Sequence, residues 1–262
     1  MAAADMFEES QQKILKLSKE KPSLRNLLAT RLEQLAEKFS ELEVAELSAQ
    51  EGSFEFSSVE RIKQGFVKFK TEKFLKQPGL FNQLKKGQSP KFMVFACSDS
   101  RVCPTTILGF EPGEAFVVRN VANKIPPWDK SGYPGSSAAL LHLKVSNILV
   151  IGHSRCGGIH ALISHGVNGK PWSDFIESWI RIGEPACART LATIADADIG
   201  KQCTHCEKES VNLSLTNLLT FPWVRDEVRD GKVSLHGAHY DFLEGSLELW
   251  TVDLKVSSIT TL

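Results

Sequence analysis

Three short apolar runs constrain the fold of this chain more than any other feature. They are rich in Val, Ile and Phe and lie at 92–96, 115–118 and 148–151. Continuous apolar runs of this length are typical of strands buried on both faces, as in parallel sheets. Helical sequence separates the runs, and further helices are expected at 158–165, 173–196 and 205–219. We therefore predict an α/β fold with a mainly parallel central sheet and flanking helices.

An amphipathic pattern precedes this region. Leucine and phenylalanine recur at spacings of three and four between Leu24 and Leu42, which predicts a helix with one apolar side. The stripe is too short for an extended coiled coil, so we expect an arm that packs on its own body or on a partner subunit. The predicted organisation is an N-terminal helical arm over residues 1–50 and an α/β domain over residues 51–262.

Two further local patterns bound the predicted domain. Ser57 and Glu60 have the spacing of a capping box and predict the start of a helix. Near the other end, apolar and polar residues alternate at 233–236 and 247–252. This alternation predicts half-buried C-terminal edge strands.

Charge and hydropathy exclude two classes of partner. The 262 residues contain 31 Lys plus Arg and 31 Asp plus Glu, so the broad positive field of a nucleic-acid-binding protein is absent. Apolar runs such as 148–151 are far shorter than the ~20 residues that cross a bilayer. We expect neither a nucleic acid partner nor membrane insertion.

Cysteine usage indicates the compartment. The chain has six cysteines and begins without a secretory signal pattern, which favours free thiols in a reducing environment. We expect a cytoplasmic protein, with the chloroplast stroma as the alternative if a transit peptide has been removed.

Residues of the types that bind soft metals follow two of the three predicted strands. Cys97 follows the first, and His153 and Cys156 follow the third. Because ligands bind beyond the carboxyl ends of parallel strands, we expect these three side chains to converge. Two thiolates and an imidazole favour zinc, and three protein ligands leave a fourth position open, as in catalytic sites. The alternative is a pair of buried cysteines and a core histidine.

Neighbouring residues suggest how such a centre is completed. Asp99 and Arg101 share one side of an extended segment, so their ion pair would keep the carboxylate ionised as a hydrogen-bond acceptor. The alternative is an ordinary surface pair. Gly157 has no side chain to obstruct close approach beside Cys156.

The chain resembles the β-class carbonic anhydrases, in particular their plant-type members. The resemblance is carried by three segments in the family's order, namely 97–101, 112–123 and 152–158. The later segments 203–209 and 240–242 also look like the plant branch. The similarity extends from about Val59 to Trp250.

This resemblance implies a fold, a reaction and roles for particular residues. It implies zinc-dependent, reversible hydration of CO2 to bicarbonate and a proton, and a homodimer or larger homo-oligomer. It places one zinc ion on Cys97, His153 and Cys156, with Asp99 and Arg101 as the catalytic pair. The family also has a closed form in which the aspartate binds zinc. The residues implied to contact substrate are Gln88, Phe116, Val121 and Gly157.

One segment departs from the family pattern. The helical stretch 136–144 lacks a turn that carries an active-site tyrosine in plant-type members. The alternative function is therefore a zinc-binding scaffold protein with little or no turnover. Hydrolysis of a related linear substrate, COS or CS2, is a third hypothesis.

A second cysteine motif is a candidate for metal binding or redox function. Cys203 and Cys206 have the C-x-x-C spacing of structural zinc sites and redox pairs. No second pair lies nearby and no strand precedes them, so we expect these small thiols to pack at a helix terminus.

Overall fold

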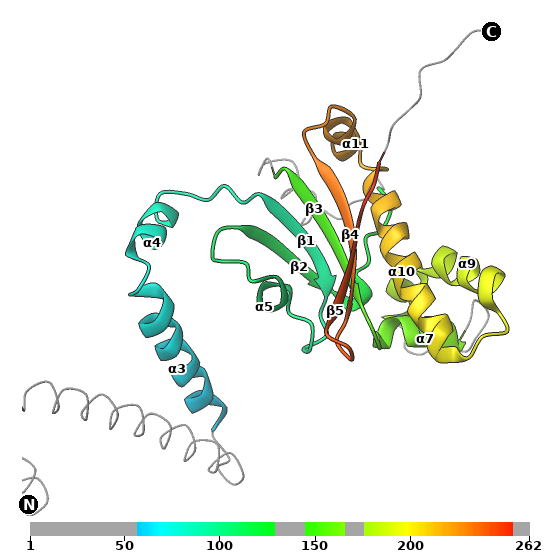
Figure 1. Cartoon of the computed structure of the whole chain (residues 1–262), viewed down its shortest axis with the longest axis horizontal. Helices are drawn as coiled ribbons and strands as arrows, with labels where there is room; N and C mark the ends of the chain where they lie inside the picture. Colours follow the sequence, from blue (N-terminus) through cyan, green and yellow to red (C-terminus); the bar gives the residue numbers. More distant parts are fainter. Residues whose placement is uncertain (1–56, 129–144, 166–175, 254–262) are drawn as a thin grey trace, which may run out of the picture. The chain divides into compact units, whose positions relative to one another are not determined.

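The computed structural model describes residues 57–128, 145–165 and 176–253 (Figure 1). The chain divides into two compact units, 1–78 and 79–262. Within the described ranges, no helix combines the length and the hydropathy needed to cross a bilayer.

The described part of the first unit is helical. It consists of α3 (Ser58–Phe69) and a short π-helical segment, η1 (Lys70–Phe74). The Ser57 hydroxyl accepts a hydrogen bond from the backbone N–H of Glu60 at 3.3 Å, so the predicted capped helix start is confirmed. The expected arm over residues 1–50 lies outside the described residues.

A sheet with five strands in the described residues forms the centre of the second unit (Figure 1). The strands follow the spatial order β2-β1-β3-β4-β5. The first four are parallel, and β5 runs antiparallel to β4 at one edge. The predicted mainly parallel sheet is therefore confirmed. The strands are β1 (Phe92–Cys97), β2 (Ala115–Asn120), β3 (Asn147–His153), β4 (Ser234–Asp241) and β5 (Ser246–Thr251).

The two C-terminal strands occupy different positions. Strand β5 is the antiparallel edge strand that its alternating sequence predicts. Strand β4 instead lies between β3 and β5 and pairs with β3 in parallel. Its burial explains the position, because Leu235 and Ala238 point to opposite faces and are each 1% exposed.

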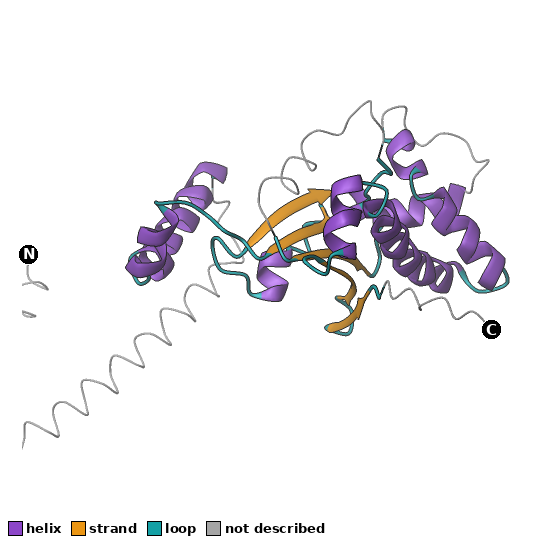
Figure 2. Cartoon of the chain, turned by 90° about the horizontal axis from the view of Figure 1, so that it is seen from above, coloured by secondary structure: helices purple, strands orange, loops and turns teal. Residues whose placement is uncertain are grey.

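Helices cover the sheet, and Figure 2 shows most helices of the second unit gathered to one side of the strands. Helix α10 packs on β3, β4, α7 and α9. It starts at Ile199, earlier than predicted, because the Asp198 side chain caps it by accepting from the Lys201 N–H at 3.0 Å. The helices are α4 (Pro78–Leu84), α5 (Pro104–Leu108), η2 (Val121–Asn123, 3₁₀), α7 (Gly157–His165), α8 (Glu177–Arg181), α9 (Glu184–Ile194), α10 (Ile199–Leu218) and α11 (Pro222–Arg229).

Close packing of α10 on the sheet determines the surroundings of the β3 carboxyl end. Met93 and Val150 on the sheet share a core with Val211 on α10. A Cβ atom added to Gly152 would lie 2.9 Å from Val211 Cγ2 and 3.5 Å from the backbone oxygen of Glu207. The glycine therefore lets α10 approach β3 one residue before His153.

Candidate metal centre

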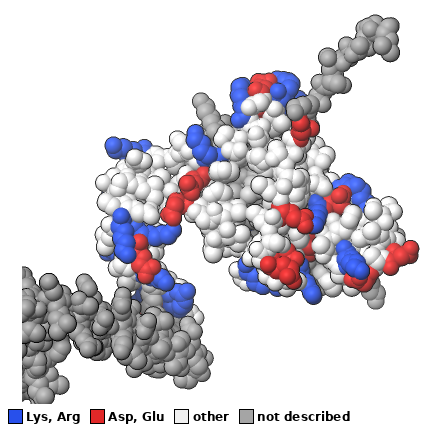
Figure 3. Space-filling view, viewed as in Figure 1, with Lys and Arg blue, Asp and Glu red and all other residues white. Residues whose placement is uncertain are grey.

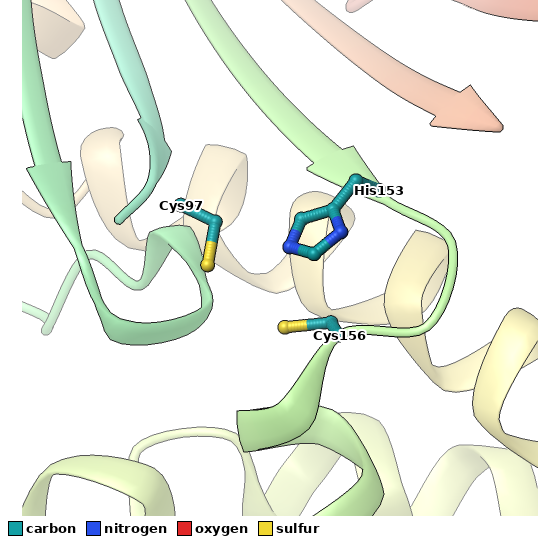
Figure 4. Close-up of side chains that lie close together, drawn as sticks. All are labelled: Cys97, His153 and Cys156. Atoms are coloured by element: carbon teal, nitrogen blue, oxygen red, sulfur yellow. The ribbon is translucent and has the colours of Figure 1, made fainter. Parts of the chain in front are cut away.

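Three side chains converge where two neighbouring strands end (Figure 4). Cys97 is the last residue of β1, His153 is the last residue of β3, and Cys156 directly precedes α7. Their sulfur and ring nitrogen atoms all lie within 4.8 Å of one another. The three residues are 5%, 1% and 2% exposed. Because β1 and β3 are parallel neighbours, their carboxyl ends meet at one edge, and the predicted convergence is confirmed.

The His153 ring is oriented as a metal ligand. Its Nδ1–H donates to the backbone oxygen of Ser154 at 2.8 Å, so the neutral form of the ring carries its lone pair on Nε2. Nε2 is buried and has no hydrogen-bond partner. A buried nitrogen lone pair beside two thiols matches the donor set that zinc prefers, so these residues fit a zinc ion.

The two thiols strongly influence each other. The adjacent Cys156 thiol lowers the pKa of Cys97. The adjacent Cys97 sulfur, together with burial, raises the pKa of Cys156. Because the pKa values of the two cysteines shift in opposite directions, the two sulfurs share one proton. A bound dication would replace that proton and favour both thiolates. The electrostatics therefore favour a cation at this position.

Asp99 and Arg101 form the predicted pair beside these ligands. Arg101 donates from Nε to Asp99 Oδ1 at 2.9 Å and from Nη2 to Oδ2 at 2.6 Å. These bonds hold the pKa of Asp99 well below its usual range. Arg101 Nη2 also approaches the backbone oxygen of Arg155 at 3.4 Å, and the guanidinium lies 4.4 Å from the ring centroid of Phe242. The carboxylate is thus held as an ionised acceptor, paired with Arg101.

Two residues with an expected substrate role lie next to the ligands. Gly157 is the first residue of α7, and open space lies where its Cβ would be. Val121 lies against the first turn of α7, since its Cγ1 is 3.1 Å from the position of a Cβ on Gly158. Both therefore border the space beside Cys156.

Two other residues with an expected substrate role lie elsewhere in this chain. Phe116 is the second residue of β2 and pairs with Met93, near the amino end of the sheet. Gln88 precedes β1 and lines an open pocket with Leu84 and Gly113. The six residues of β1 span about 17 Å, so Gln88 and Phe116 are separated from Cys97 by most of the strand length. The structure does not bring them to the three ligands within one chain.

Sequence reasoning missed one residue that braces this region. The Arg119 side chain donates from Nε to the backbone oxygen of Cys97 at 2.9 Å and from Nη2 to that of Asp99 at 2.6 Å. It thus ties the segment after β1 to the end of β2. A charged residue directly after the apolar run 115–118 was the available signal.

The second cysteine motif lies in the helical core. Cys203 and Cys206 are on α10 and are 8% and 0% exposed. Within the ranges that the structure describes, Cys97, His153 and Cys156 are the one group of three or more Cys, His, Asp or Glu side chains close enough to hold a metal ion. The packing role expected for Cys203 and Cys206 agrees with this placement.

Comparisons with known proteins agree with the site. The family profile described as carbonic anhydrase matches residues 92–247. The chain is 45% identical over 260 residues to beta carbonic anhydrase 3 of Arabidopsis thaliana, covering 97% of each protein. The chain belongs to the β-carbonic anhydrases. Like the family as a whole, this β-carbonic anhydrase is an enzyme.

Solved structures of β-carbonic anhydrases share its fold. The β-carbonic anhydrase CcaA is 29% identical with a TM-score of 0.68, and the match covers 76% of this chain and 92% of CcaA. A tetrameric β-carbonic anhydrase of Sordaria macrospora is 27% identical with a TM-score of 0.66, covering 73% and 96%. The alternative function, a zinc-binding scaffold protein with little or no turnover, depended on the segment 136–144. That segment lies outside the described residues, and no observation favours this alternative.

Proposed function

We propose that this β-carbonic anhydrase holds one zinc ion on Cys97, His153 and Cys156 and catalyses the reversible hydration of CO2 to bicarbonate and a proton. The observation that carries the proposal is the buried, unpartnered Nε2 of His153 within 4.8 Å of two thiols. Zinc, when bound, lowers the pKa of a water ligand to about 7 and so supplies a nucleophile at neutral pH. Three protein ligands leave a position for that water.

Asp99 orients the nucleophile in this proposal. A carboxylate only accepts hydrogen bonds, so Asp99 selects a nucleophile whose oxygen carries a proton. Because that O–H points at the carboxylate, the lone pair of the nucleophile's oxygen points away from it. The two bonds from Arg101 fix the carboxylate in place and keep it ionised. Anions without a proton are repelled from the same position.

The substrate pocket is proposed to combine residues of two subunits. Val121 and Gly157 border the ligands within one chain. Gln88 and Phe116 lie toward the opposite end of the sheet, so a role at the same centre requires a second copy of the chain. We infer that Gln88 of a second copy donates a hydrogen bond to substrate and that Phe116 forms part of the apolar wall.

Exposed apolar residues support a homo-oligomer. On α3, Ile62 and Phe66 are 70% and 62% exposed, and on the edge strand β5, Leu249 is 64% exposed. Exposed apolar helix faces and unpaired sheet edges are common subunit contacts. The tetrameric Sordaria relative agrees with this proposal. On the face seen in Figure 3, the charged residues of both signs are interspersed, which does not favour a polyanion as partner.

A reducing compartment is part of the proposal. All six cysteines are free, and five of them are buried. Free thiols are typical of the cytoplasm and of the chloroplast stroma. We propose a cytoplasmic location and keep the stroma as the alternative.

A zinc titration of the metal-stripped protein tests the proposal. CO2 hydration, followed by stopped-flow absorbance of a pH indicator, is expected to rise linearly with added zinc and to level off at one equivalent per chain. Magnesium and calcium serve as controls and are expected to restore nothing, because both prefer oxygen ligands. Turnover that does not depend on zinc would refute the proposal.

A further inference from the structure

The loop between β3 and α7 is held by a carboxylate from another helix. The backbone N–H of Cys156 donates to Glu207 Oε1 at 3.1 Å, and Glu207 is 2% exposed on α10. The preceding residue, Arg155, has a φ of 56°, a left-handed conformation that is strained for a residue with a side chain. The hydrogen bond thus holds the chain where it leaves a strained turn.

A buried histidine orients that carboxylate. His239 on β4 is 3% exposed, and its Nε2 lies 2.9 Å from Glu207 Oε2. Since a carboxylate only accepts, His239 is the donor in this bond. His239 pairs in register with Gly152 of β3, the glycine that lets α10 approach the sheet. Both oxygens of Glu207 are therefore occupied, one by His239 and one by the loop.

We propose that Glu207, oriented by His239, is a positioning residue for the metal ligand Cys156. This inference rests on the proposed zinc function. Without the carboxylate, the Cys156 N–H is buried without a partner and the left-handed turn at Arg155 is free to relax. A relaxed turn moves the Cys156 sulfur away from Cys97 and His153. The expected consequence is weaker metal retention with an altered ligand geometry.

A purely structural role makes a different prediction. If the pair of Glu207 and His239 only joins α10 to β4, its removal lowers the free energy of unfolding but leaves metal binding by the folded protein unchanged. Metal readouts therefore separate the two roles. Zinc release to a chromophoric chelator reports retention, and the absorption of the cobalt-substituted protein reports thiolate bonding and geometry.

The variants are chosen to isolate the contact with the loop. Glu207→Ala removes the acceptor, and His239→Phe removes the residue that orients it. Glu207→Gln keeps an amide oxygen that is able to accept from Cys156. Ser214→Ala is the matched control, because Ser214 is buried on the same helix and accepts from the backbone N–H of Ile125 at 3.3 Å.

We expect zinc release to accelerate about tenfold or more in Glu207→Ala and His239→Phe, since loss of such supporting contacts commonly costs 10- to 100-fold in metal affinity. The cobalt–thiolate absorption is expected to shift in both. Glu207→Gln is expected to restore release to within about threefold of wild type, and Ser214→Ala to leave it unchanged.

Wild-type zinc release and an unchanged cobalt spectrum in His239→Phe and Glu207→Ala would overturn the inference while leaving the proposed function intact. If Glu207→Ala does not fold, the zinc release rates and cobalt spectra of His239→Phe and Glu207→Gln are compared instead. Wild-type values in His239→Phe would then overturn the inference. A wild-type protein that takes up no zinc would instead refute the proposed function.

Discussion

Arg101 holds Asp99 through two parallel hydrogen bonds, 2.9 Å from Nε to Oδ1 and 2.6 Å from Nη2 to Oδ2. The Asp99 side chain is only 17% exposed, whereas that of Arg101 is 50% exposed. The guanidinium thus covers the carboxylate on its solvent side and fixes its orientation beside the metal ligands. A lysine cannot reproduce this two-point contact.

Arg101→Lys is expected to lower CO2 turnover by about 100-fold, because a misplaced catalytic group commonly costs that much. Zinc content should remain at the wild-type value, since Arg101 does not contribute a ligand. Arg189→Lys is the matched control, because Arg189 makes a similarly exposed ion pair with Glu209 at 2.6 Å. Equal turnover in Arg101→Lys and wild type would show that the two-point contact is dispensable.

Cys103 is expected to be the most reactive thiol of the protein. It is the one partly exposed cysteine among the six, and hydrogen bonding to the Thr105 hydroxyl lowers its pKa to about 7. Since the thiolate is the nucleophile, alkylation by iodoacetamide should rise through a midpoint near pH 7. Peptide mass spectrometry at a series of pH values measures this rate.

Thr105→Val is the control for that thiol. Loss of the hydroxyl should move the alkylation midpoint of Cys103 upward, toward the ordinary cysteine value of 9.0. Burial raises the pKa of Cys206 to about 12, so that thiol should stay unreacted over the same range. A wild-type midpoint near 9 would contradict the prediction.

Gln88 is expected to act in the site of a second subunit. Co-expression of Gln88→Ala and Cys97→Ser chains, each with its own affinity tag, yields heterodimers that can be purified over two columns. If Gln88 acts across the interface, one of the two sites is complete, and activity should be roughly half that of wild type because the interface is symmetric. Each parent homodimer should be inactive or strongly impaired. Inactive heterodimers would show that Gln88 acts within its own chain.

Gly237 is expected to be intolerant of any side chain. A Cβ there would lie 2.3 Å from Trp250 Cε2, and the Trp250 ring is held by its hydrogen bond to Asn212 at 3.0 Å. Gly237→Ala should therefore lower the free energy of unfolding by about 1–3 kcal/mol, the usual cost of overpacking. Urea denaturation followed by circular dichroism measures the change.

Gly79→Ala provides the comparison for Gly237. Gly79 lies in α4, and a Cβ there would meet no atom within 4 Å. Its substitution should leave stability unchanged or raise it by about 0.4–1 kcal/mol, because alanine has less freedom in the unfolded chain. Equal destabilisation by both substitutions would contradict the packing seen at Trp250.

Sequence predicts those parts of the site that depend on residues close together along the chain. Cys97 and His153 each follow a continuous apolar run, and the general geometry of parallel sheets brings such positions together. The Asp99–Arg101 pair is likewise local, because the two residues are separated by one position. For these residues, strand prediction alone is sufficient to place the side chains.

The remaining parts depend on contacts between distant segments. The hydrogen bond from Cys156 to Glu207 joins residues 51 positions apart, and it exists only because α10 packs closely on Gly152. Similarly, the position of β4 inside the sheet follows from the path of the chain through α10 and α11. The alternation of apolar and polar residues within the strand does not encode that path. The strand predicted at 92–96 already separates Gln88 from Cys97, but no local pattern encodes a contact with a second copy of the chain.

Stopped-flow CO2 hydration by wild type and Asp99→Asn at equal, measured zinc content tests the proposed activity most directly. Asparagine fills the same space but presents an N–H donor, so it no longer selects a proton-bearing nucleophile. We expect fast, zinc-dependent turnover in wild type and a loss of about 100-fold or more in Asp99→Asn with zinc retained. Full zinc occupancy without turnover in wild type, or equal rates in both proteins, would contradict the proposed mechanism.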